Sequence, residues 1–131
     1  MRFFQLLVKT YTCGMNITLQ PIAFGTVDPN RISSEQTITV QNTGSVQGTI
    51  SMSGSNWTDE NNTTVMNADT TKYSITSGEY NSKTSLSENA QDVASIMFEN
   101  ILNIFLQLHA DLLDSFFSGD LGQEIEVNLT C

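Results

Sequence analysis

The sequence predicts an all-β protein, a single antiparallel β-sandwich domain. The length of 131 residues leaves room for one sizeable hydrophobic core. Apolar and polar residues alternate in short segments separated by polar turns, as in the strands of a sandwich. Charged residues make up only 15% of the chain, and much of the polarity comes from Ser, Thr, Asn and Gln, which suit an exposed sheet face better than a helix surface. A closed barrel is the less favoured alternative.

The opening stretch, FFQLLV, follows a basic residue as the apolar part of a secretion leader would. It is only six residues long, a Gln interrupts it, and no A-x-A cleavage pattern follows, so the sequence does not favour a leader. Phe4, Leu6 and Val8 share the even phase, whereas the next apolar set begins at Tyr11 in the odd phase. One strand cannot bury both sets on one side without a bulge. The stretch is therefore a bulged first strand, a disordered tail, or a strand added to a neighbouring copy.

The following strands rest on the same alternation. Residues 11–19, EQTITVQN and VQGTISMSG each alternate, and the turn from Asn42 to Ser45 predicts that the last two form an antiparallel hairpin. Inward positions are predicted at Ile38, Val40, Val46, Ile50 and Met52. Short strands are expected near 65–66 and 72–75, with Trp57 filling one end of the core.

The stretch 85–117 supports two interpretations. Val93, Ile96 and Met97 have helical spacing, and a capping box at Ser85 and Glu88 would start a helix. From Leu106 to Leu112 the apolar residues alternate instead. We predict one short helix near 87–98, then a strand near 103–113 paired with a last strand near 122–131. One long amphipathic helix is the alternative.

Two features indicate an extracellular protein. Cys13 and Cys131 lie in strand-like segments near opposite ends of the chain, where a disulfide would close nearly the whole chain; two buried free thiols are the alternative. N-glycosylation acceptors of the form Asn-x-Ser/Thr occur at Asn16, Asn56, Asn61, Asn62 and Asn128. With few lysines, these features favour a secreted or cell-surface location.

Composition and motifs give no support for several other classes. A net charge of −9 opposes binding to nucleic acid and to anionic membranes, and no apolar run is long enough to span a bilayer as a helix. His109 is predicted on a polar strand face, and the acidic pairs Glu124/Glu126 and Asp111/Asp114 are interpreted as solvated carboxylates. The segment DENN offers oxygen ligands for calcium but lacks EF-hand spacing. We expect no enzyme activity, no metal site and no cofactor, with N-linked glycans as the expected modification.

The run TITVQNTGSVQGTISMSGSNWTD, the upstream IAFGTVDPN, and the downstream FLQLHADLL and FSGDLGQEIEVNLTC resemble the immunoglobulin-like sandwich domains of archaeal secreted and cell-surface proteins. The resemblance covers residues 11–131. It implies an immunoglobulin-like or jelly-roll-type sandwich used in surface layers, adhesion or pili. Archaeal bundling pili and related bacterial biofilm-matrix fibres are similar sandwiches joined by an N-terminal donor strand, and residues 2–9 stand where that strand would be.

Together these observations predict a strand over residues 1–10 that is donated to a neighbouring subunit, and a sandwich over 11–131. The expected function is a structural subunit of an extracellular filament, with copies of the chain joined head-to-tail and other cell surfaces as further partners. The alternative is an adhesin or carbohydrate-binding module of a cell-surface protein, with Trp57 and Tyr80 as its candidate exposed aromatics. The expected inserting residues are Phe3, Phe4, Leu6, Leu7 and Val8.

Overall fold

The protein is described here from a computed structural model, which describes residues 3–12, 15–17, 22–110 and 120–131. Among residues 3–17, side chains are described for residues 4–7 only. The strands are β1 (Phe3–Thr12), β2 (Met15–Ile17), β3 (Ile22–Thr26), β4 (Gln36–Asn42), β5 (Gly48–Gly54), β6 (Trp57–Thr58), β7 (Thr64–Met66), β8 (Thr71–Ser74), β9 (Thr84–Ser85), β10 (Gln91–Ile96), β11 (Ile101–Leu108) and β12 (Leu121–Thr130). Two short 3-10 helices, η1 (Ala68–Thr70) and η2 (Tyr80–Ser82), complete the described elements.

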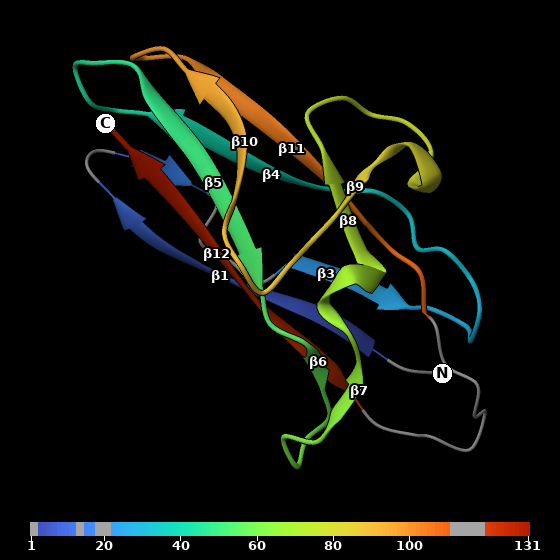
Figure 1. Ribbon diagram of the computed structural model, residues 1–131. Helices are drawn as coiled ribbons and strands as arrows, with labels where there is room; N and C mark the ends of the chain where they lie inside the picture. Colours follow the sequence, from blue (N-terminus) through green and yellow to red (C-terminus); the bar gives the residue numbers. More distant parts are fainter. Residues whose placement is uncertain (1–2, 13–14, 18–21, 111–119) are drawn as a thin grey trace.

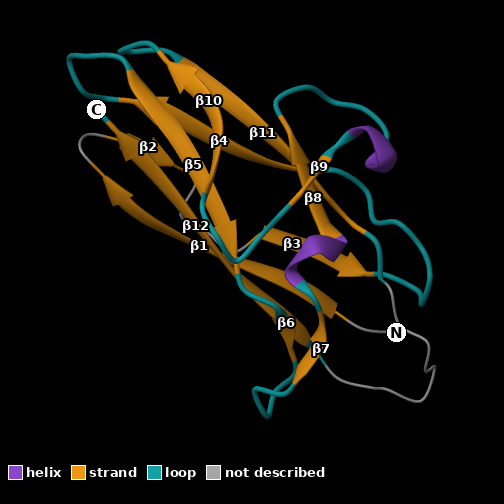
Figure 2. Cartoon of the chain, in the orientation of Figure 1, coloured by secondary structure: helices purple, strands orange, loops and turns teal. Residues whose placement is uncertain are grey.

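The strands form two sheets that pack face to face, which confirms the predicted all-β sandwich (Figures 1 and 2). The first sheet has the order β10-β5-β12-β1-β3, with β6 and β7 attached beside β12. The second has the order β2-β4-β11-β8-β9. Neighbouring strands are antiparallel in both sheets, except that β1 runs parallel to β12.

The core lies between the sheets because each long strand alternates buried and exposed residues. In the second sheet β4 and β11 contribute Ile38, Val40 and Leu106, all fully buried. Trp57 is also fully buried, and its ring packs edge-on against Phe4 with centroids 5.3 Å apart. The prediction that Trp57 fills the core is thus confirmed, and this residue does not form an exposed platform.

The predicted hairpin through Asn42–Ser45 is wrong. β4 belongs to the second sheet and β5 to the first, so the turn carries the chain from one layer to the other. Both strands still bury one face, because each points that face at the core from opposite sides. Val46, expected inward, lies on the turn and is 52% exposed.

The short helix expected near 87–98 is also wrong, since residues 91–96 form the edge strand β10. The ladder between β10 and β5 shifts register between Asp92 and Ala94, which is a β-bulge. The bulge changes the phase of alternation, so that Val93 and Ile96 both pack toward the core although they are three residues apart. That spacing is what the sequence pattern offered as helical.

The predicted pairing of the last two strands is wrong as well. β11 pairs with β4 and β8 in the second sheet, whereas β12 pairs with β1, β5 and β6 in the first. Both strands exist close to their expected positions, although residues 111–113 of the expected strand lie outside the described residues. The strands near 65–66 and 72–75 are confirmed as β7 and β8.

Candidate strand-insertion site

The first strand lies inside its sheet rather than at an edge. β1 pairs in parallel with β12 without interruption from Phe4↔Leu121 to Thr12↔Leu129. On its other side it pairs antiparallel with β3 from Phe3 to Leu6. We call the space between β12 and β3 the β1 slot. A strand in this slot satisfies the backbone groups of two neighbours at once.

Two side chains of β1 complete the hydrophobic core. Phe4 and Leu6 are fully buried, and Phe4 contacts Trp57, which Phe24 of β3 also approaches at 6.3 Å between ring centroids. Burying side chains of this size contributes about 1.5–3 kcal/mol each. The slot therefore has a strong requirement for apolar residues at these two positions.

The chain changes sheet between Thr12 and Met15, later than the change of phase near residue 10. β1 stays in the first sheet through Thr12, and residues 15–17 form β2 in the second sheet. The ladder of β1 with β12 has no bulge where the phase changes. A different bulge lies in β3, whose register shifts opposite Phe4 and Gln5, and Gly25 of β3 has φ of 73°. The expected domain boundary after residue 10 falls within β1.

A buried network of hydrogen bonds next to the slot holds Trp57 in place. Trp57 Nε1 donates to Thr71 Oγ1 at 2.9 Å, and the Thr71 hydroxyl donates to Gln123 Oε1 at 2.9 Å. Gln123 Nε2 donates to the Ser55 carbonyl at 2.8 Å. Thr71 and Gln123 are themselves buried. Because every step of this chain has a partner, a polar group inside the core is tolerated and the indole is held in one orientation.

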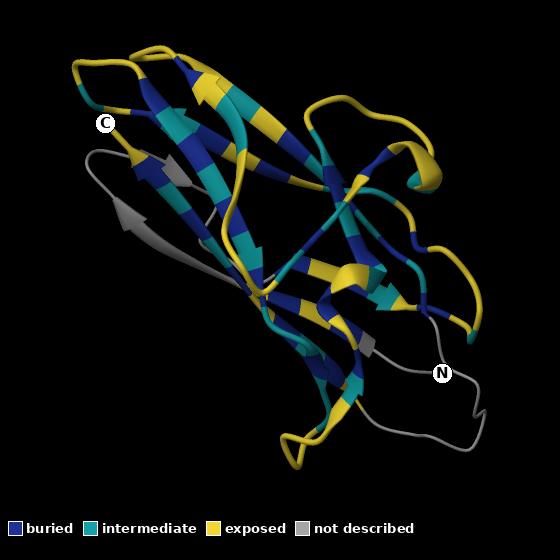
Figure 3. Cartoon of the chain, in the orientation of Figure 1, coloured by how far each residue is buried: buried dark blue, intermediate teal, exposed yellow. Residues whose placement is uncertain are grey.

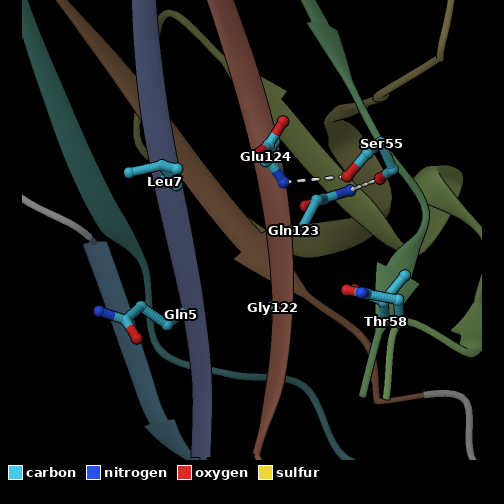
Figure 4. Close-up of a pocket in the computed structure, with 8 residues that line it drawn as sticks. Gln5, Leu7, Ser55, Thr58, Gly122, Gln123 and Glu124 are labelled. Carbon is cyan, nitrogen blue, oxygen red and sulfur yellow. Dashed lines mark hydrogen bonds between the residues drawn. The ribbon is translucent and has the colours of Figure 1, made fainter. Parts of the chain in front are cut away.

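The outer surface of the slot is hollowed. A cavity of about 460 Å³ is lined by Gln5 and Leu7 from β1, by Gly122, Gln123 and Glu124 from β12, and by Ser55, Thr58 and Asn62 across from them. Figure 4 shows these residues around the hollow, where Ser55 accepts a hydrogen bond from the Glu124 N–H at 2.9 Å. Amide, hydroxyl and carboxylate groups contribute to the lining together with apolar surface, and Leu7 is its large apolar side chain.

The five residues expected to insert have different surroundings. Phe4 and Leu6 face the core, whereas Leu7 is 43% exposed and faces the hollow. Phe3 and Val8 take part in the β1 ladders, but their side chains are not among those described.

The C-terminal cysteine forms a disulfide. Cys131 is disulfide-bonded, while Cys13 lies outside the described residues, so the predicted pairing stays a prediction. The parallel register brings Thr12, which precedes Cys13, opposite Leu129, two residues before Cys131.

The five predicted glycosylation acceptors lie in different environments. Asn61 and Asn62 are exposed on the loop between β6 and β7. Asn56 is half-buried, and its side-chain oxygen accepts the Ala68 N–H at 2.9 Å. Asn128 is half-buried in β12, and Asn16 lies in β2 with its side chain undescribed. On exposure alone, Asn61 and Asn62 are the most accessible acceptors among those with described side chains.

Polar residues considered for other chemistry are engaged in local structure. His109 lies 6.0 Å from Tyr80 between ring centroids, and the Tyr80 hydroxyl donates to the Thr70 carbonyl, so Tyr80 is not an open platform. Asp59 Oδ1 accepts the N–H groups of Asn61 and Thr63, both at 2.9 Å. Within the described residues, no group of three or more His, Cys, Asp or Glu is placed to hold a metal.

Sequence reasoning missed the residues that build the slot from the other strands. Gln123, Thr71 and Ser55 are distant in sequence and carry no motif, and their common role follows only from the topology. Among the described residues, no helix is long and apolar enough to cross a membrane. No protein family model matches the chain, and no curated protein matches it.

Proposed function

We propose that this protein is a structural subunit of an extracellular filament, and that the first strand of one copy fills the β1 slot of the next. The sandwich is of the immunoglobulin-like or jelly-roll type, and exposed Asn residues carry N-linked glycans at the cell surface. The observation that carries the proposal is the position of β1. A strand from the beginning of the chain occupies an interior slot, pairs with the last strand, and completes the core with Phe4 and Leu6.

Exchange of β1 between copies changes none of the contacts that the strand makes in the slot, so these contacts favour neither the closed subunit nor the exchanged one. Phe4 and Leu6 meet the same partners whether the strand comes from the same chain or from another. The balance between the closed subunit and a chain of subunits then depends on the connection after β1 and on concentration. Because the donated strand and the slot are different surfaces, the contact is heterologous and need not close, and its repetition gives a filament.

Electron microscopy of the full chain and of the same chain without residues 1–9 tests this proposal. Fibres are expected with the full chain alone. A capping experiment then tests the slot directly: a synthetic peptide of residues 2–10 should stop the growth of wild-type fibres by occupying the slot at growing ends.

Two variant peptides supply a matched control. Leu6 is fully buried and Leu7 is 43% exposed, so the Leu6→Asp peptide should lose the capping effect and the Leu7→Asp peptide should keep it. Dispersed single particles from both chains would overturn the proposal. Equal capping by the two variant peptides would also oppose insertion in the register described.

The hollow beside the slot favours a second candidate function, an adhesin or carbohydrate-binding module. Hydroxyl and amide groups from Ser55, Thr58 and Asn62 line it, and such groups hydrogen-bond to sugars. A glycan-array measurement on the full chain, compared with the Thr58→Ala and Asn62→Ala variants, tests this function. Binding that is insensitive to both substitutions would remove the hollow as its site.

A further inference from the structure

Exposed apolar side chains gather on two adjacent turns. Seven large hydrophobic residues are substantially exposed in the described chain, and four of them are Val46, Met97, Phe98 and Ile101, with exposures of 52%, 48%, 48% and 61%. They lie on the segments 43–47 and 97–101, which we call the apolar tip. Both turns are exposed in Figure 3. Scattered apolar residues are ordinary on a protein surface, whereas a cluster of this kind indicates a contact surface.

The backbone beneath the tip is held firmly. The side chain of Asn42, itself fully buried, donates to the Val46 carbonyl at 2.9 Å and to the Ile96 carbonyl at 3.2 Å. The backbone of Asn42 also exchanges hydrogen bonds with the opposite turn, accepting from Glu99 at 2.8 Å and donating to Asn100 at 3.1 Å. One residue therefore ties the two turns together, and the four apolar side chains project from a fixed base.

The turn at 97–100 also carries conformational strain. Glu99 has φ of 65°, in the left-handed region where Gly or Asn is the usual residue. Strain of this kind costs of order 1–3 kcal/mol and tends to occur at functional positions. Here the strained residue, Glu99, directly follows the exposed side chains of Met97 and Phe98.

The tip lies at the end of the sandwich where β1 finishes. Thr12 pairs with Leu129, Leu129 with Ile50, and the start of β5 at Gly48 with Ile96, so these rungs lie side by side just below the tip. A strand that leaves its own slot while remaining attached after residue 12 would leave from this end. A neighbouring subunit that receives the strand is therefore brought toward the tip.

Charge also favours a second copy at this surface. The chain has a net charge of −9, so two copies repel each other over much of their surfaces. Glu99 is the one charged residue in the two tip segments. Apolar contact can form here with less like-charge repulsion than elsewhere.

We propose that the apolar tip is the surface on which a second copy of the chain docks, adding an apolar contact to the junction made by the exchanged strand. This inference rests on the proposed filament function, because the exchanged strand is what directs the neighbour to the tip. The tip supplies binding that does not require insertion into the slot.

A pair of double variants of the full chain tests the tip. Phe98→Ser with Ile101→Ser removes two of its side chains, and Ile32→Ser with Ile75→Ser is the matched control, since those residues are 50% and 48% exposed away from the tip. The critical concentration for assembly is measured by sedimentation. We expect an increase of about tenfold or more for the tip variant and no change for the control.

The outcomes separate the tip from the filament proposal. Assembly of the tip variant at the wild-type concentration would overturn the tip and leave strand exchange standing. If the wild-type chain forms dimers but no fibres, and the tip variant does not form these dimers, docking at the tip would stand and the filament proposal would fall. A wild-type chain that stays monomeric, or that instead binds phosphatidylcholine vesicles through the tip, would overturn the docking of a second copy.

Discussion

A single hydroxyl connects the slot to the rest of the core. Thr71 accepts from Trp57 and donates to Gln123, and all three residues are buried. Thr71→Val keeps the shape but leaves a buried N–H and a buried amide oxygen without these partners. Each such group costs about 1–3 kcal/mol. Because two groups lose their partner, we expect the free energy of unfolding to fall by between one and two times that amount. Urea titration followed by circular dichroism, which does not depend on Trp57, measures it.

The control for this substitution is Thr37→Val, which removes a hydroxyl from an exposed position in β4 and should change the unfolding midpoint little. Adding Trp57→Phe to Thr71→Val removes the orphaned donor. The combined loss should therefore be smaller than the sum of the two single losses. Strict additivity would mean that the hydrogen bond contributes nothing to stability.

The carboxylate of Glu35 makes stability depend on pH. Its pKa is lowered from 4.5 to about 2 by the hydrogen bond from the Lys83 ammonium, and then by those from the Ser77 hydroxyl and the Gly78 N–H. A lowered pKa in the folded state stabilises the fold above pH 4.5, and this stabilisation is lost as the pH falls toward 2. Glu35→Gln should therefore lower the urea midpoint at pH 7. The midpoints of Glu35→Gln and wild type should become equal as the pH approaches 2.

Removing another carboxylate separates this effect from general acid sensitivity. Glu60→Gln removes an exposed carboxylate and should leave the difference from wild type small at every pH. A gap between wild type and Glu35→Gln that stays constant between pH 7 and pH 2 would show that the ionised carboxylate is not its source.

At the level of elements, close packing limits where β5 can carry a side chain. A Cβ on Gly54 would lie 2.2 Å from Leu86 Cδ2 and 2.9 Å from Leu86 Cγ, and Leu86 is almost fully buried. We expect Gly54→Ala to destabilise the protein by about 1–3 kcal/mol through overpacking. Thermal or urea unfolding measures this loss.

The second-site variant Leu86→Ala makes the test specific. It vacates the space that the new methyl group needs, so Gly54→Ala should cost less in the Leu86→Ala background than in wild type. An equal cost in both backgrounds would assign the effect to the backbone preference of glycine rather than to the contact with Leu86.

The sequence was informative about elements where alternation was uninterrupted. β4, β12 and the short strands near 65–66 and 72–75 were predicted because one face of each strand is buried. The alternation broke at the bulge in β10, where one extra residue gave Val93 and Ile96 the spacing of a helix. Alternation reports which face of a strand is buried but not which sheet the strand joins, so the turn after Asn42 was mistaken for a hairpin.

The candidate site was less accessible to prediction because it is a property of the whole molecule. The apolar residues at the start of the chain put Phe4 and Leu6 among the five residues expected to insert into a sheet, and the structure buries both, whereas Leu7 is 43% exposed. The slot that holds them is made by β12 and β3, from distant parts of the sequence. Parallel pairing of the first and last strands has no local signature, since it depends on how the two sheets share the intervening strands.

At the scale of the whole chain, the disulfide at Cys131 bears on the proposed strand exchange, because it decides which part of β1 would stay attached to its own subunit. If its partner is Cys13, the bond closes a loop across 118 positions, and Cys131→Ser should lower the free energy of unfolding by about 4–5 kcal/mol in the loop-entropy model. Cys13→Ser should give the same loss, and the double variant should add nothing further.

Non-reducing electrophoresis and peptide mapping check the pairing. A monomer with linked terminal peptides keeps the end of β1 tied to its own last strand while the residues before it remain free to exchange. A dimer that reduction dissolves would instead mean that the bond joins two copies, and filament growth would then depend on oxidation as well as on the donated strand.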